Sequence, residues 1–85
     1  MSKNKLTVLR RKVDAVDEKI VNLLSKRFFV TSEIQEHKRE RNMRIEQKKR
    51  EVDHLKNLRK LAQKLSIPPD MVVKIFKVIF RFAKK

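Results

Sequence analysis

Residues 6–34, LTVLRRKVDAVDEKIVNLLSKRFFVTSEI, decide the fold. Their apolar residues recur at alternating spacings of three and four, which is the pattern of one face of an amphipathic helix. We call this face the apolar stripe, and its members are Leu6, Leu9, Val13, Val16, Ile20, Leu23, Val30 and Ile34. The helical pattern extends over about residues 5–41, which predicts a helix about 54 Å long.

Arg27 occupies the position of the apolar stripe that follows Leu23. A guanidinium that faces a helical core is costly unless an anion meets it there. Lys38 comes eleven residues later, close to a whole number of turns, so it falls near the same face. The pattern therefore predicts an anion site inside a helical bundle. The alternative is that Arg27 reaches water from the edge of the stripe.

Two shorter helices follow a turn that is predicted around Asn42, over about residues 47–65 and from Pro69 onward. The first has its apolar face at Leu55, Leu58, Ala62 and Leu65, and extending that face back by four residues places Glu51 on it. The second begins with Pro69 and Asp70, residues that suit a helix N-terminus. Its inward-facing residues are predicted to be Val72, Ile75, Phe76, Ile79, Phe80 and Ala83. The fold class is therefore all-α, and residues 1–85 are predicted to form a single domain.

Composition restricts the function further. The 85 residues include no glycine and no cysteine, which excludes glycine-rich phosphate loops and thiol chemistry. The histidines, His37 and His54, are predicted to be surface residues and have no ligand-spaced companions, so no metal is expected. No apolar run approaches the length of a membrane span, and a cytoplasmic location is the default expectation. A chain this short buries too little surface alone, so two chains are expected to interlock as a homodimer.

The candidate site combines Arg27, Lys38, Arg50 and Glu51 of one chain with Arg10 of the other. Arg10 lies about 26 Å from Arg27 along one helix, so only an antiparallel partner could bring these two cations together. Several cations and one carboxylate suit a dianionic metabolite that carries a hydroxyl group. No nucleophile is paired with a base, so the site favours catalysis by orientation and electrostatic stabilisation over covalent catalysis.

Two segments carry a resemblance to a known family: LRRKVDAVDEKIVNLLSKR, residues 9–27, and EIQEHKRERNMRIEQKKREVDHL, residues 33–55. They resemble the all-helical AroQ-type chorismate mutases over nearly the whole chain. The ordered motif elements are Leu9-Arg10, Val16-Asp17 with Ile20, Leu23-Leu24 with Arg27, Lys38, and Arg50-Glu51. Each element alone is weak, but the ordered set with these spacings is fairly specific.

The resemblance implies an interlocked homodimer of three-helix chains that converts chorismate to prephenate by a pericyclic shift without a cofactor. It implies that Arg10 of the partner chain and Arg27 bind substrate carboxylates. Lys38 would contact a carboxylate and the ether oxygen, and Glu51 would accept a hydrogen bond from the ring hydroxyl. Arg50 would add positive potential.

The sequence departs from the family pattern at three positions of the substrate site. Gln47 stands where an acid is usual, and Ala83 stands where a serine is usual. The Gln or Glu that donates to the ether oxygen would fall at position 87. Losing such a donor can cost about 10²–10³ in rate, unless Lys38, Lys84 or Lys85 compensates.

Three other functions remain open at this stage. One is an isochorismate-pyruvate lyase, which has the same fold and similar cations. Another is a weakly active or inactive relative that depends on a larger partner enzyme. The net charge of +14 also motivates a basic helical module that binds nucleic acid. However, the chain has no recognised nucleic-acid motif, so such binding is expected to be non-specific at most.

Overall fold

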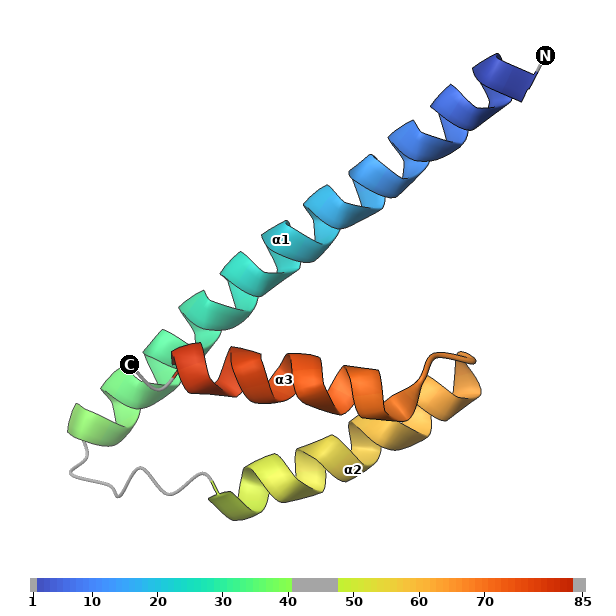
Figure 1. Cartoon of the computed structure of the whole chain (residues 1–85). Coiled ribbons are helices and arrows are strands. Elements are labelled where there is room, and N and C mark those ends of the chain that lie inside the picture. The colour runs from blue at the N-terminus through green and yellow to red at the C-terminus, as the bar shows by residue number, and fades with distance from the viewer. Residues whose placement is uncertain (1, 41–47, 84–85) are drawn as a thin grey trace. The chain divides into compact units, whose positions relative to one another are not determined.

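The computed structural model describes residues 2–40 and 48–83, and all three elements are helices: α1 (Ser2–Glu40), α2 (Lys48–Lys64) and α3 (Pro69–Ala83) (Figure 1). The predicted all-α class with one long and two shorter helices is confirmed. The chain divides into two compact units, Met1–Ile34 and Gln35–Lys85, so the boundary between them falls within α1. Within the described ranges, no helix combines the length and the apolar character that crossing a membrane requires.

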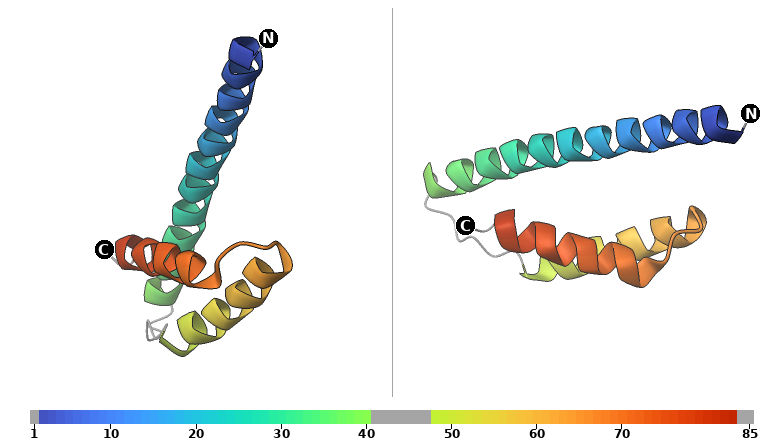
Figure 2. Two further views of the ribbon diagram at one scale, coloured as in Figure 1. Left: turned by 45° about the vertical axis from the view of Figure 1, so that its right-hand side comes forward. Right: turned by 45° about the horizontal axis from the view of Figure 1, so that its top comes forward.

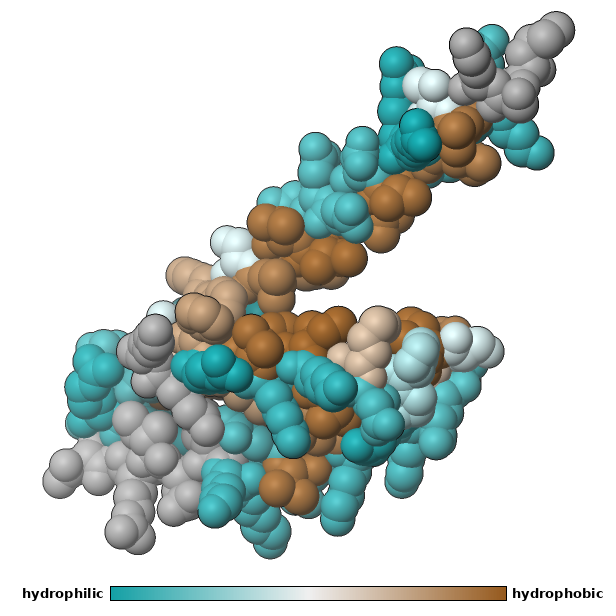
Figure 3. Space-filling model, viewed as in Figure 1, coloured by the Kyte–Doolittle hydropathy of each residue, from teal (hydrophilic) through white to brown (hydrophobic). Residues whose placement is uncertain are grey.

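The first unit contains most of α1. The helix starts about three residues earlier than predicted and is continuous for 39 residues, since no glycine or proline interrupts it. Figure 3 shows hydrophobic residues following the length of α1 along one side. All eight members of the apolar stripe are between 42% and 62% exposed in the single chain. The face predicted to be apolar therefore exists, and this chain alone leaves it in contact with water.

In the second unit, α2 and α3 lie side by side and run in opposite directions (Figures 1 and 2). The buried apolar side chains of the described residues all lie on these two helices and are Ala62, Val73, Ile79 and Phe80. Two predictions for this core are wrong. Ile75 was expected to face inward but is 47% exposed, and Val73 is buried in its place. Leu65 is exposed because α2 ends at Lys64, one residue before it.

The connection from α2 to α3 begins with a C-terminal cap on α2. Ser66 adopts a left-handed conformation with φ of 60°. The Ile67 amide donates to the Ala62 carbonyl at 2.8 Å, and the Ser66 amide donates to the Gln63 carbonyl at 3.2 Å. These two bonds form a Schellman motif, which satisfies carbonyls that the end of α2 would otherwise leave unpaired.

The first turn of α3 matches its predicted chemistry. The helix begins at Pro69, whose ring fixes a helical φ and whose missing N–H is not needed there. Asp70 lies in the same turn, where its negative charge interacts favourably with the positive end of the helix dipole. Its carboxylate also accepts a hydrogen bond from Arg59 of α2 at 2.9 Å. This exposed ion pair joins the two helices close to their connection.

Candidate active site

Arg27 and Lys38 lie on the less exposed face of α1. The half-buried residues of the C-terminal part of this helix recur at helical spacing and are Leu24, Arg27, Phe28, Thr31, Gln35 and Lys38. The Nη1 atom of Arg27 is shielded from solvent. An arginine that simply reached water from the helix edge would instead have an exposed guanidinium. Arg27 and Lys38 therefore share a half-buried face of α1, and their part in an anion site stays a prediction.

Arg10 is exposed on the same helix. Seventeen residues separate it from Arg27, which corresponds to about 26 Å along the axis of a continuous helix. One copy of α1 therefore does not bring these two cations together. The predicted participation of Arg10 depends on a second chain and stays a prediction.

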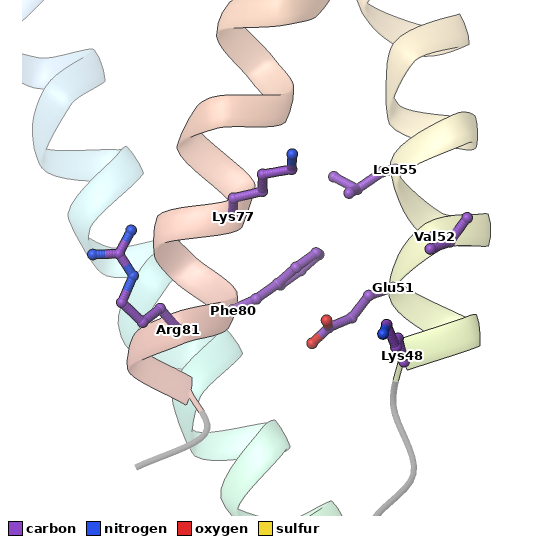
Figure 4. A pocket seen from close by; sticks show the side chains of 7 residues that line it. All are labelled: Lys48, Glu51, Val52, Leu55, Lys77, Phe80 and Arg81. Carbon is purple, nitrogen blue, oxygen red and sulfur yellow. The ribbon is translucent and has the colours of Figure 1, made fainter.

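Glu51 lies in the first turn of α2 and is half-buried. Its carboxylate points from α2 into an open hollow between α2 and α3 (Figure 4). The hollow has a volume of about 510 Å³, within the size range of small-molecule sites. Its described lining consists of Lys48, Glu51, Val52, Leu55, Lys77, Phe80 and Arg81.

The chemistry of this hollow is mixed. Val52, Leu55 and Phe80 give it an apolar wall, and Phe80 is itself buried. Three cationic side chains accompany the single carboxylate of Glu51 along its rim and wall. Such a lining suits a small anion that has an apolar body and a hydroxyl group, because the carboxylate can accept a hydrogen bond while the cations offset negative charge.

The C-terminal end of α3 is held by α1. Gln35 Nε2 donates a hydrogen bond of 2.9 Å to the carbonyl of Ala83, one of the last carbonyls of α3. Ala83 is half-buried, and its methyl side chain has no polar group to offer a substrate. At this position the structure therefore contains a backbone contact and not a side-chain donor.

The other predicted site residues divide into two groups. Arg50 is exposed at the start of α2, next to Glu51 in sequence. Gln47 lies outside the described residues, as do Asn42, Lys84 and Lys85. Of the predicted residues that the structure describes, Glu51 is the one that lines the hollow.

Several residues of this region were not anticipated. Lys48, Lys77 and Arg81 line the hollow, and the spacing of three and four residues between Lys77, Phe80 and Arg81 could have indicated a shared helix face. His54, predicted to lie on the surface, is half-buried. Its ring centroid lies 6.2 Å from that of Phe76 and 6.3 Å from that of Phe80, so this histidine packs with two of the phenylalanines that were predicted to face inward.

Residues 9–85 match the family model described as chorismate mutase type II, a range that contains every predicted motif residue. The chain belongs to the type II chorismate mutase family. The predicted family and its all-helical fold are confirmed, and the match supports the predicted activity and isomerase class. The roles of individual residues stay predictions.

Two curated relatives share this similarity. The T-protein of Enterobacter agglomerans is 34% identical over 76 residues, which cover 89% of this chain and 20% of that protein. The chorismate mutase of Methanocaldococcus jannaschii is 28% identical over 80 residues, which cover 94% of this chain and 81% of that protein. The chain thus spans about a fifth of the T-protein and most of the M. jannaschii chorismate mutase. No solved structure matches the chain significantly.

Proposed function

We propose that this chain catalyses the rearrangement of chorismate to prephenate. The observation that carries the proposal is the family match over residues 9–85, which includes the complete ordered set of motif residues. The M. jannaschii relative, which is named chorismate mutase, aligns with nearly the whole chain. Glu51 and its hollow add a suitable place for a small anion with a hydroxyl group.

The chemistry places few demands on the protein. In this pericyclic reaction an ether C–O bond breaks while a C–C bond forms within the same molecule, so no cofactor, nucleophile or proton transfer is required. The protein accelerates it by holding the substrate in its compact conformer and by stabilising the negative charge that develops on the ether oxygen. Cations at fixed positions can do both.

The side chains are assigned to this chemistry by their place in the family pattern. Arg27 and Arg10 of a second chain bind the two carboxylates, and Lys38 contacts a carboxylate and the ether oxygen. The shared face of Arg27 and Lys38 on α1 supports this assignment. Glu51 accepts a hydrogen bond from the ring hydroxyl, and its carboxylate points into the hollow in Figure 4. Arg50 contributes positive potential from the exposed start of α2.

The working unit is a homodimer in which two α1 helices cover each other. The eight half-exposed side chains of the apolar stripe are more apolar surface than a stable monomer usually leaves in water. An antiparallel α1 helix of a second chain would cover the apolar stripe and remove it from water. It would also place Arg10 of one chain beside Arg27 of the other. The predicted dimer and cytoplasmic location both belong to this proposal.

The direct test is to incubate the purified chain with chorismate and to follow chorismate loss together with prephenate formation. Prephenate formation that depends on enzyme concentration is the expected result. Release of pyruvate and salicylate from isochorismate, without turnover of chorismate, would replace the mutase by the lyase. Binding of chorismate without any turnover would indicate a relative that is inactive alone or depends on a partner.

A further inference from the structure

Lys77 is a cation that the family pattern does not include and that the fold places in the hollow beside Glu51. It lies on α3, one turn before the buried Phe80. Residues three and four apart share a helix face, so Lys77, Phe80 and Arg81 form the side of α3 that lines the hollow. The opposing wall is the first part of α2, including Glu51 and Leu55.

The two α3 cations differ in direction. Figure 4 shows Lys77 extending from α3 toward α2, whereas Arg81 extends away from α2. Glu51 projects from the opposite wall, with Phe80 between the two helices. Lys77 is exposed. Its long side chain can extend along the wall of the hollow while its ammonium group stays in contact with water. Of the two, Lys77 is the cation placed to meet a ligand that also contacts Glu51.

Charge in the hollow favours an anion. Lys48, Lys77 and Arg81 outnumber the single carboxylate of Glu51 in the lining, so its charge favours a small anion. Val52, Leu55 and Phe80 form an apolar wall against which the body of such a ligand can pack. A ligand whose hydroxyl meets Glu51 can therefore direct a carboxylate toward α3.

We propose that Lys77 is a substrate-positioning residue that adds a further cationic contact to one carboxylate of the dianion, beside the arginines assigned to it above, while Glu51 accepts a hydrogen bond from its hydroxyl group. The assignment rests on the proposed function, because it takes chorismate as the ligand of the hollow. Lys77 increases affinity and fixes orientation and does not touch the bond that breaks. Its loss therefore affects substrate binding more than the chemical step.

The test compares three variants of the full chain in steady-state kinetics with chorismate. Lys77→Met keeps the length of the side chain and removes its charge, and Lys77→Arg keeps the charge. Lys74→Met is the matched control, since Lys74 is an exposed lysine of α3 outside the described lining of the hollow. Lys77→Met is expected to raise KM about tenfold with little change in kcat, the usual size of a lost charge-assisted hydrogen bond. Lys77→Arg is expected to restore most of the affinity, and Lys74→Met to match the original chain.

Equal KM values for Lys77→Met and Lys74→Met would overturn the assignment and leave the proposed function intact. No turnover by the original chain would instead overturn the proposed function, and calorimetric titration with chorismate then decides about Lys77. Binding weakened in Lys77→Met but not in Lys74→Met would support its role, and equal binding would refute it. Circular dichroism checks that each variant keeps its helices, and Lys77→Gln replaces Lys77→Met if the latter does not.

Discussion

Arg27 and Lys38 share the half-buried face of α1, and their substitution tests the site at the scale of single residues. Arg27→Ala and Lys38→Ala each remove a cation that is proposed to stabilise substrate charge. We expect each to lower kcat/KM for chorismate by about 10²-fold or more, the usual effect of losing a preorganised donor. Circular dichroism should show unchanged helix content, because alanine has the highest helix propensity.

Lys26→Ala supplies the control for both substitutions. Lys26 precedes Arg27 in sequence but is exposed on another side of α1, so its loss should leave turnover near that of the original chain. Equal activity in Lys26→Ala and Arg27→Ala would show that a general loss of positive charge, and not a particular site, accounts for any effect. Full activity in Arg27→Ala or Lys38→Ala would refute the assignment of that residue.

The candidate site was partly predictable from sequence. Arg27 breaks a regular apolar pattern, and a family motif specifies the position of Glu51, so both can be found without a structure. Lys77 has neither signal, because an isolated lysine on a short helix is indistinguishable from a solvated one until α2 lies opposite to it. The prediction that His54 lies on the surface is wrong for the same reason. Its contacts with Phe76 and Phe80 come from another helix.

At the scale of the helices, the end of α2 has a testable weakness. Ser66 takes a left-handed conformation that glycine adopts without steric cost, and the chain contains no glycine. Ser66→Gly should raise the free energy of unfolding by about 0.5–1 kcal/mol, after allowing for the greater freedom of glycine in the unfolded chain. Urea unfolding followed by circular dichroism measures this change. Ser66→Ala keeps the Cβ atom and should not stabilise, so equal stabilisation by both would contradict the explanation.

Gln35 allows a second test, at the end of α3. Its side chain donates to the Ala83 carbonyl, which satisfies one of the acceptors that a helix C-terminus leaves free. Gln35→Leu should cost about 1 kcal/mol of stability and should speed amide hydrogen exchange in the last turn of α3. Gln63→Leu makes the same chemical change at an exposed position of α2. If the two variants exchange equally at that turn, the hydrogen bond does not hold it.

The helices themselves were more predictable than their ends and contacts. The spacing of apolar residues identified all three helices, and Pro69 identified the start of α3. The limits of α1 and α2 shifted by one to three residues, since fraying and capping depend on local hydrogen bonds. The exchange of Ile75 for Val73 in the core depends on how α3 is rotated against α2, which periodicity alone does not determine.

For the whole molecule, the exposed apolar stripe and the position of Arg10 lead to one decisive prediction. Each proposed site takes Arg27 from one chain and Arg10 from the other, so Arg10→Ala and Arg27→Ala chains should each be nearly inactive. A mixed dimer of the two has one intact site, and random exchange of equal amounts should restore about a quarter of the original activity. Sedimentation of the unmixed chain should give about twice its mass of 10.3 kDa, and tagged chains should verify that subunits exchange. Exchange without recovery of activity would refute the shared site, whereas a monomeric and fully active chain would refute the dimer itself.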